Sequence, residues 1–246
     1  MKIFAFIFAR GNSKGIKNKN IKNFLGSPLL THTISFAKKV KIFDKIILSS
    51  DSSKILSLGK KNNLFLIKRP KKLASDFSPE WLSWKHAINF INKKNFFFDL
   101  MVVLPCTTPL RTNEDLIKCI KAIKSKVDVV TTVAKSNHHP SFNMVRKNIK
   151  NYIGIYNKNK KLFHRRQDTE EIFNLSNSIY VTTPMYVLNK KSMFEGKVKG
   201  IEVPQERSID IDSNFDFIYA EEMFKKLKLK LKIKKINNLN ISNIKY

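Results

Sequence analysis

The stretch from Ala9 to Gly15 combines small residues with two cationic side chains and could bind a phosphate group. It reads Ala-Arg-Gly-Asn-Ser-Lys-Gly and follows an apolar run at the start of the chain. Small residues let backbone N–H groups approach an anion closely, and Arg10 and Lys14 would add fixed positive charge. The spacing is not that of a Walker loop, Gly-x-x-x-x-Gly-Lys-Ser/Thr. A basic surface loop in a lysine-rich chain is the alternative that charge alone leaves open.

A pair of carboxylates near the end of the chain could bind a metal ion. Asp210 and Asp212 stand two residues apart in Ser-Ile-Asp-Ile-Asp, so in an extended segment both would point to the same side. Paired carboxylates beside a phosphate site suit magnesium. The same spacing allows an N-cap at Asp212, Ser213 or Asn214 for a helix that begins near Phe215.

Two further segments carry side chains that could bind a base or a sugar. Thr107-Thr108-Pro109-Leu110-Arg111 places hydroxyl groups and an arginine just after a predicted strand. Arg165-Arg166-Gln167 offers two adjacent guanidinium groups, either of which could hold a carboxylate bidentately. An ordinary turn with a helix cap and a solvated pair of charges explain these two segments equally well.

Covalent catalysis and zinc-dependent catalysis are not indicated. The chain has no Gly-x-Ser-x-Gly motif and no Cys/His nucleophile pattern. His138 and His139 are adjacent, which is a poor chelating arrangement, and no cysteine or carboxylate lies nearby at ligand spacing. The two cysteines, Cys106 and Cys119, form no disulfide framework and fit a reducing cytoplasm.

The elements that must position these residues alternate between strand and helix. Strands are predicted at 2–8, 45–48, 64–67, 99–104 and 128–133, and helices at 28–40, 52–60, 80–91 and 113–123. Their short connections predict an α/β fold with an open, mostly parallel sheet and helices on both faces. Ligands of such sheets bind at the carboxyl ends of the strands, and the segments 10–20, 49–51 and 105–111 fall there.

After residue 135 the pattern changes. Residues 143–146 and 152–156 are predicted to form a short hairpin, an insert that could cap the site or contact a second subunit. A strand is expected over 178–188 and a final helix over 215–227.

We divide the chain into a main domain at 1–228, with its insert at about 135–165, and a lysine-rich tail at 229–246. At 228–233, lysine alternates with leucine or isoleucine, which is a strand period. We expect a frayed, solvated extension there, with a membrane-surface or partner-binding strand as the alternative.

The composition of the 246 residues limits which classes of partner are expected. The net charge of +28 would by itself favour nucleic acid as a partner. The excess is almost all lysine, with only seven arginines, which indicates a composition bias and a solvated surface, so no nucleic-acid partner is expected. No apolar run reaches ~18 residues, so no membrane insertion is expected. Met1 to Ala9 is interpreted as a buried strand rather than a signal peptide, and a cytoplasmic location is expected.

Together these segments resemble the acylneuraminate cytidylyltransferase family, the CMP-sialic-acid synthetases. The blocks that match in order are residues 9–16 with Lys19-Asn20, Ser-Ser-Asp at 49–51, Arg69-Pro70 through Leu73-Ala74-Ser75-Asp76, Thr-Thr-Pro-Leu-Arg at 107–111, and Ser-Ile-Asp-Ile-Asp at 208–212. The resemblance covers residues 1–225, nearly the whole chain. It implies a Rossmann-like nucleotidyltransferase fold of the GT-A type. It also implies a homodimer, with the segment at 135–165 contributing to the subunit contact.

The reaction implied by the resemblance joins a nonulosonic acid, such as N-acetylneuraminate or legionaminate, to CMP. CTP and the 2-keto sugar acid give the CMP-sugar and pyrophosphate. The residues expected to bind CTP are Arg10, Gly11, Asn12, Ser13, Lys14, Lys19, Asn20 and Arg69. Those expected at the sugar acid are Thr107, Arg111, Arg166 and Gln167. Asp210 and Asp212 would hold Mg²⁺, and the expected catalytic residues are Arg10, Lys14 and Asp212.

Three positions depart from the pattern of the family, all on the sugar side. Pro105 stands where many relatives carry a glutamine of the sugar site. The family's Asn-Gly before the late strand falls at Ser176-Asn177, and an arginine often found just before it is replaced near Asn174. These changes predict a sugar acid whose N-acyl or glycerol-like groups differ from those of ordinary sialic acid, such as legionaminic or pseudaminic acid.

Three alternatives to this function are considered. A cytidylyltransferase for Kdo shares the fold and chemistry, but its first loop usually differs from Gly-Asn-Ser-Lys-Gly. An inactive family member would bind nucleotide without turnover. A basic, non-enzymatic protein would bind nucleic acid, although the chain lacks a recognition helix, a stacking-aromatic pattern and a zinc module.

Overall fold

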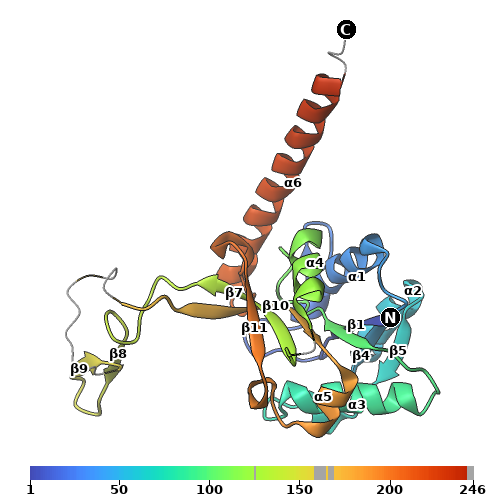
Figure 1. Cartoon of the computed structure of the whole chain (residues 1–246), viewed down its shortest axis with the longest axis horizontal. Coiled ribbons are helices and arrows are strands. Elements are labelled where there is room, and N and C mark those ends of the chain that lie inside the picture. Colours follow the sequence, from blue (N-terminus) through green and yellow to red (C-terminus); the bar gives the residue numbers. More distant parts are fainter. Residues whose placement is uncertain (125, 158–164, 166–168, 243–246) are drawn as a thin grey trace.

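A seven-stranded sheet forms the centre of the computed structural model, which describes residues 1–124, 126–157, 165 and 169–242, with side chains as far as residue 228 (Figure 1). The strand order is β11-β7-β10-β6-β1-β4-β5. The strands run parallel except β10, which is antiparallel to both neighbours. Their bounds are β1 Ile3–Phe8, β4 Lys45–Ser50, β5 Phe65–Lys68, β6 Leu100–Val103, β7 Val129–Lys135, β10 Phe173–Thr182 and β11 Val198–Glu202.

Helices cover both faces of this sheet. On one face pack α1 (Leu29–Val40), α2 (Ser53–Lys61) and α4 (Asn113–Ala122). On the other face pack α3 (Glu80–Asn92) and α5 (Pro184–Asn189). The predicted α/β class, with an open and mostly parallel sheet, is therefore confirmed.

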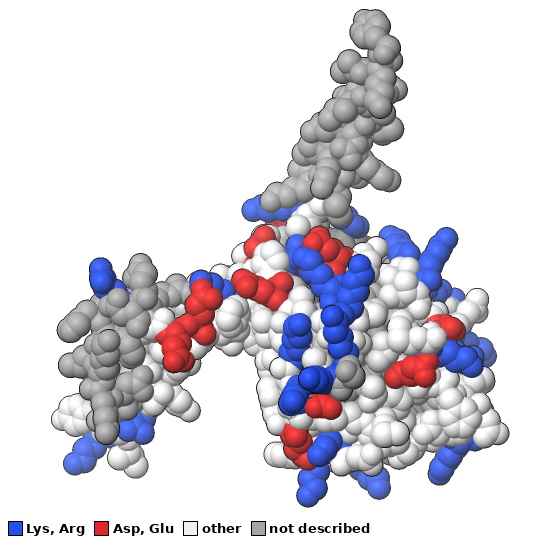
Figure 2. Space-filling model, viewed as in Figure 1, with Lys and Arg blue, Asp and Glu red and all other residues white. Residues whose placement is uncertain are grey.

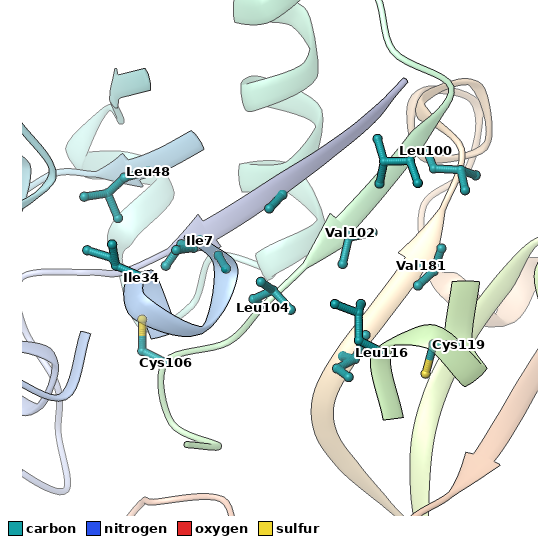
Figure 3. Packing of buried hydrophobic residues seen from close by; sticks show 14 of the residues in the cluster. Ile7, Ile34, Leu48, Leu100, Val102, Leu104, Cys106, Leu116, Cys119 and Val181 are labelled. Carbon is teal, nitrogen blue, oxygen red and sulfur yellow. The ribbon is translucent and has the colours of Figure 1, made fainter. Parts of the chain in front are cut away.

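The first strand shows why the sheet needs both layers. Ile3, Ala5 and Ile7 enter the hydrophobic core shared with α1, α2 and α4 (Figure 3). Phe4 and Phe6 enter the core shared with α3 and α5. Because successive side chains of a strand point to opposite faces, an apolar run without polar breaks is stable only when both faces are covered. β1 is therefore a central strand, and the loop after it starts deep within the molecule.

A third, smaller core ties the first loop to the last helix. It contains Ile16, Phe24 and Leu29 from the start of the chain, packed with Ile211, Phe217 and Ala220 from the end. The last three residues lie in or just before α6 (Asn214–Ser242). This contact brings the basic loop and the acidic pair, about two hundred positions apart in the sequence, to the same part of the molecule.

Short elements carry the loops around the strand ends. They are η1 Lys19–Ile21, β2 Asn23–Phe24, β3 Ser27–Pro28, η2 Lys71–Ala74, η4 Met193–Glu195 and η5 Gln205–Arg207.

The region after residue 172 differs from the prediction. The strand expected at 178–188 is β10, which already starts at Phe173, and the second half of the expected range is the helix α5. Pro184 explains the change, because proline cannot donate to a strand ladder but fits the first turn of a helix. Thr183 caps that helix by accepting from the Tyr186 backbone N–H at 3.2 Å. The edge strand β11 was not predicted, since its sequence, Val-Lys-Gly-Ile-Glu, carries a weak strand pattern.

Two parts project from this body (Figure 1). The predicted hairpin is present as β8 (Val145–Lys147) and β9 (Ile153–Ile155), a separate two-stranded sheet. The helix α6 leaves the body in another direction. Its backbone stays helical through the lysine-rich stretch. The prediction of a frayed chain there, and the alternative of a strand, are therefore wrong. Lysine and leucine both have high helix propensity, and this outweighs the alternating pattern.

The face shown in Figure 2 is rich in lysine and arginine, with acidic side chains beside them. Among the described helices, none combines the length and the apolar composition that a membrane span requires.

Candidate active site

A cavity of about 420 Å³ opens where the parallel strands end. Its wall contains Phe8 at the end of β1, Arg69 just after β5, and residues 105–107 just after β6. Of the residues predicted to form a site, the wall brings together Arg10, Ser13, Lys19, Asn20, Arg69, Thr107 and Asp210. These come from four separate sequence blocks and meet at the predicted edge of the sheet.

The loop after β1 is held in place from two sides. The Gly11 backbone N–H donates to Asp51 Oδ1 at 2.9 Å, and Asn20 Nδ2 donates to the Arg10 carbonyl at 3.0 Å. Gly15 lies so close to the backbone of Asp212 that no Cβ atom would fit there. The glycines therefore serve close packing, and the polar partners fix the direction of Arg10.

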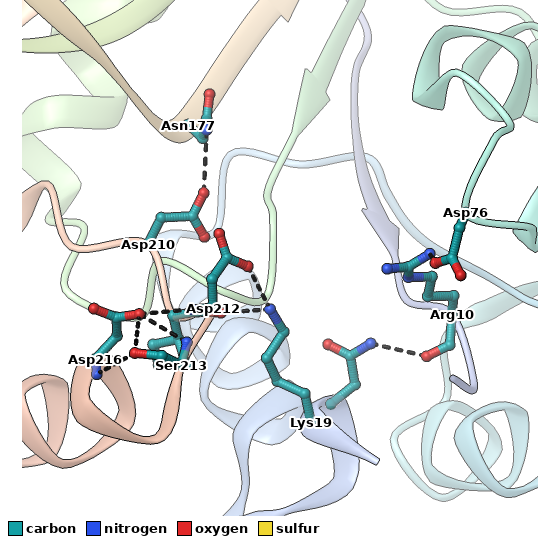
Figure 4. Close-up of polar contacts among 10 residues, drawn as sticks. Arg10, Lys19, Asp76, Asn177, Asp210, Asp212, Ser213 and Asp216 are labelled. Atoms are coloured by element: carbon teal, nitrogen blue, oxygen red, sulfur yellow. Dashed lines mark hydrogen bonds and ion pairs between the residues drawn. The ribbon is translucent and has the colours of Figure 1, made fainter. Parts of the chain in front are cut away.

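The cationic end of the site is occupied by a carboxylate of the chain itself. Arg10 Nη1 donates to Asp76 Oδ1 at 2.6 Å (Figure 4). Lys14 Nζ lies 3.4 Å from Asp76 Oδ2. Burial of the Asp76 carboxyl would raise its pKa, but the hydrogen bonds from Arg10 and Lys14 outweigh this and lower it. The two cations thus already hold an anion where the sequence predicted a phosphate group.

Arg69 is a buried cation with capacity to bind a ligand. It is 6% exposed, lines the cavity and donates from Nη1 to Ser83 Oγ at 3.1 Å. Burial lowers its pKa, although the nearby carboxylate of Asp51, 3.9 Å from Nη2, opposes this effect. Its Nε has no hydrogen-bond partner among the described residues. A buried donor of this kind is usually satisfied, so the hydrogen bonding of Arg69 is incomplete within the described residues.

Asp210 also lacks one partner. Its Oδ2 accepts from Asn177 Nδ2 at 3.1 Å (Figure 4). Its Oδ1 is buried and has no hydrogen-bond partner in the part of the chain that the structure describes. Asp210 lines the cavity, and the hydrogen bonding of this buried oxygen is incomplete within the described residues.

Asp212 stands farther out and pairs with Lys19. The Asp212 side chain is 79% exposed, and Lys19 Nζ donates to its Oδ1 at 2.9 Å and also to the Ile211 carbonyl. The cap of α6 falls to other residues, since Asp216 accepts from the Ser213 backbone N–H at 2.7 Å and Ser213 Oγ accepts from the Asp216 N–H at 3.2 Å. The capping alternative thus applies to Ser213, and Asp210 and Asp212 are not used for it.

The acidic pair fits a magnesium ion that is bound together with its substrate. Among the described residues no group of three or more His, Cys, Asp or Glu side chains could hold a metal ion. Magnesium is usually held by one or two carboxylates, with substrate phosphates and water completing its shell. The two carboxylates, one of them with a buried oxygen that has no partner among the described residues, are compatible with that requirement.

Arg111 lies beneath the cavity rather than in its wall. It is 6% exposed and donates from Nε to the Ser178 carbonyl at 2.9 Å and from Nη2 to Thr108 Oγ1 at 2.8 Å and to the Pro105 carbonyl. Burial lowers its pKa to about 10, so it stays charged at neutral pH. The sequence suggested contact with the sugar acid, whereas the structure gives its donors to the loop after β6 and to β10.

The remaining predicted residues divide between the cavity wall, its surroundings and the part of the chain outside the described residues. Thr107 lines the cavity, and its carbonyl accepts from the Ile211 backbone N–H at 2.9 Å, which joins the wall to the acidic segment. The cavity wall does not include Gly11, Asn12, Lys14 or Asp212. Arg166 and Gln167 lie outside the described residues.

Sequence reasoning did not select Glu80 and Tyr180 of the wall, and it noted Asn177 only as part of a departure from the family pattern. Glu80 is exposed as a residue, but its carboxyl group is surrounded by protein. This burial raises the pKa of the carboxyl, and the nearby charge of Arg69 opposes the rise. Burial also raises the pKa of Tyr180, and the charges of Glu80 and Asp210 add to it. Glu80 resembles any acid in the first turn of a helix, so no local signal distinguishes it.

The chain is similar to known proteins over almost its whole length. Residues 4–236 match the sequence profile of a family described as Cytidylyltransferase. A CMP-N,N'-diacetyllegionaminic acid synthase of Campylobacter jejuni is 30% identical over 225 residues, 89% of this chain and 93% of that protein. Post-translational flagellin modification protein B of Campylobacter coli is 29% identical over 236 residues, 94% of this chain and 98% of that protein.

A solved structure supports the fold assignment. It is a CMP:2-keto-3-deoxy-manno-octonic acid synthetase complexed with CTP, with a TM-score of 0.68 over 92% of this chain and 99% of that chain. Its sequence is 14% identical, so the likeness shows the shared fold alone. The family match, by contrast, spans the basic loop, the cavity wall and the acidic pair. The chain belongs to the cytidylyltransferase family.

Proposed function

We propose that this cytidylyltransferase joins the CMP group of CTP to a sialic-acid-like nonulosonic acid and releases pyrophosphate. The observation that carries the proposal is the charge arrangement around one cavity. Arg10 holds an anion at one place in its wall, and Asp210, which has a carboxylate oxygen without a partner among the described residues, lines the same cavity (Figure 4). A triphosphate needs cations along its chain and a divalent ion at its reacting phosphate, and both requirements can be met here.

The residues of this chain would act by position and charge. The anomeric hydroxyl of the sugar acid attacks the α-phosphorus of CTP, its proton is lost, and the bond to pyrophosphate breaks. When CTP binds, Arg10 and Lys14 would leave the Asp76 carboxylate and contact the phosphate groups. They would then neutralise the negative charge that develops on the leaving pyrophosphate. Lys19 would hold Asp212 and the Ile211 backbone in place.

Asp210 and Asp212 are the residues that would hold magnesium. When bound, the ion would neutralise phosphate charge and lower the pKa of the attacking hydroxyl. Ser13, Asn20 and Arg69 would face the nucleotide from the same cavity.

The substrate is proposed to be a nonulosonic acid that differs from ordinary sialic acid. The named activity of the C. jejuni relative supports a legionaminic-type sugar. Pro105 and Asn177, two of the positions that depart from the family pattern, line the cavity, which supports a role for them in sugar choice. The contact of Arg166 and Gln167 with the sugar carboxylate remains a prediction from the resemblance.

A homodimer formed through the β8–β9 hairpin is part of the proposal. The hairpin exposes Met144, Val145, Ile149, Tyr152, Ile153 and Tyr156, with Ile149 99% exposed. Large apolar side chains gathered on a projecting segment favour a subunit contact. The free, buried cysteines and the use of CTP support a cytoplasmic enzyme.

Pyrophosphate release tests the reaction and names the substrate together. The full chain would be incubated with CTP, Mg²⁺ and one of N-acetylneuraminate, legionaminate, pseudaminate or Kdo. Release with one nonulosonic acid, abolished by EDTA and by Asp210→Asn, is the expected result. Release with Kdo alone would show that the substrate is Kdo and not a sialic-acid-like nonulosonic acid. No release with any sugar, while CTP still raises the melting temperature, would favour a family member that binds nucleotide without turnover.

A further inference from the structure

Asn177 occupies an unusual backbone position in the wall of the cavity. It lies in β10 where the register with β7 is interrupted between Leu175 and Tyr180, and its φ angle is 50°. This left-handed conformation favours glycine and is tolerated by asparagine. The interruption places the side chain at the cavity, next to the acidic segment. A side chain is thus kept at a position where the backbone alone would favour none.

The amide of Asn177 is oriented by a tyrosine. The Tyr180 hydroxyl donates to Asn177 Oδ1 at 2.6 Å, and Asn177 Nδ2 donates to Asp210 Oδ2 at 3.1 Å. Because a carboxylate accepts and does not donate, only one orientation of the amide satisfies both contacts. Tyr180 is itself 8% exposed and packs beside Trp84. A buried, fixed donor therefore determines which way Asn177 faces.

The consequence for Asp210 is that its two oxygens are no longer equivalent. Oδ2 is held by Asn177, while Oδ1 is buried in the wall and has no partner among the described residues. The backbone beneath is also fixed, since Thr108 Oγ1 donates to the Asn177 carbonyl at 3.3 Å and Arg111 Nε to the Ser178 carbonyl at 2.9 Å. The carboxylate is therefore held through one oxygen, while its other oxygen still lacks a partner among the described residues.

We propose that Asn177 is a positioning residue that aims Asp210 at the divalent cation of the reaction, with Tyr180 setting the amide. This inference rests on the proposed function, in which Asp210 holds magnesium. Partners of this kind usually change metal affinity by about 10- to 100-fold when they are removed. The amide would hold one oxygen of Asp210, so that the carboxylate keeps a single orientation when the ion binds.

The test measures metal binding directly, with Mn²⁺ as an ion visible by electron paramagnetic resonance. Mn²⁺ would be titrated into the full chain saturated with CTP. Asn177→Gly suits the backbone conformation and removes only the amide, and we expect about 10- to 100-fold weaker Mn²⁺ binding. Tyr180→Phe should weaken it in the same direction by less. CTP affinity measured in EDTA should stay at the wild-type value in both variants, which a general loss of structure would not allow.

Two matched controls are available in the chain. Asn63 also has a positive φ angle, 55°, but follows α2 away from the cavity, so Asn63→Gly should leave Mn²⁺ binding unchanged. Tyr186 is a buried tyrosine whose hydroxyl donates to the Met193 carbonyl at 3.1 Å, and Tyr186→Phe should also leave it unchanged.

Asp210→Asn separates failure of the inference from failure of the proposed function. If Asp210→Asn weakens Mn²⁺ binding and Asn177→Gly and Tyr180→Phe do not, the positioning role is overturned and the metal assignment stands. If Asp210→Asn has no effect, both are overturned. Weakening by all three, ordered Asp210→Asn, Asn177→Gly, Tyr180→Phe, would establish the positioning role even if no sugar in the panel is turned over.

Discussion

Gly15 lies directly against the main-chain carbonyl of Asp212. A Cβ atom at Gly15 would stand 2.0 Å from the Asp212 oxygen and 3.2 Å from its carbonyl carbon. The neighbour is backbone, which has no rotamer to change, so the two segments fit only while residue 15 has no side chain. The basic loop and the acidic segment thus touch without intervening atoms, and moving one moves the other.

Replacing Gly15 with alanine should therefore damage the site. The methyl group would push the acidic segment from the loop, and overpacking of this kind costs about 1–3 kcal/mol of unfolding free energy. We expect a melting temperature lower by several degrees and a fall in kcat/KM for CTP of at least tenfold. Gly154→Ala is the control, because, chain neighbours aside, no atom of the described residues lies within 4 Å of a Cβ at that glycine. An unchanged kcat/KM in Gly15→Ala would show that catalysis does not depend on the close contact between Gly15 and the Asp212 backbone.

Arg111→Met should act on stability rather than on substrate affinity. The change leaves buried carbonyl groups at Pro105 and Ser178 without their donor, and a lost hydrogen bond to a charged group costs about 1.5–3 kcal/mol. Guanidinium unfolding should show a loss of about 1.5–3 kcal/mol, against no change for Arg146→Met on the exposed hairpin. A raised KM for the sugar acid at unchanged stability would support the sequence-based expectation of a substrate contact instead.

Asp76→Asn should strengthen the binding of pyrophosphate. The carboxylate competes with phosphate for Arg10 and Lys14, and ion pairs that water reaches are weak. Removing the charge should tighten pyrophosphate binding by about 1.5- to 5-fold in calorimetry, with exposed Asp99→Asn as the neutral control. Weaker binding in Asp76→Asn would mean that Asp76 holds Arg10 ready for the ligand rather than blocking it.

Both cysteine thiols should be inert in the folded protein. Burial raises the pKa of Cys106 and of Cys119 to about 12, and Cys106 is 2% exposed although it belongs to the cavity wall. The thiolate is the reactive form, and at pH 8 only about one thiol in ten thousand would be ionised. Ellman's reagent should label neither thiol until denaturant is added, and rapid labelling of Cys106 in native protein would contradict its burial.

The sequence predicted best those features whose partners are close in the chain. The unbroken apolar run of β1 and the helical spacing of α1 and α3 predicted these elements to within a few residues. The loop at 9–15 and the pair at 210 and 212 stood out because their residue types and spacing carry the chemistry. β11 escaped notice because a short, half-exposed edge strand has little pattern of its own.

The sequence by itself determined the family, the alternation of strands and helices, and the residue types available at the strand ends. Only the tertiary structure decided which of these residues line the cavity and which support others by hydrogen bonds. It set Asp76 on Arg10, 66 positions away, buried Arg111 beneath the wall, and joined Tyr180 through Asn177 to Asp210. The physical reason is that a side chain's role depends on which polar groups are buried beside it, and burial brings together groups that no local pattern relates.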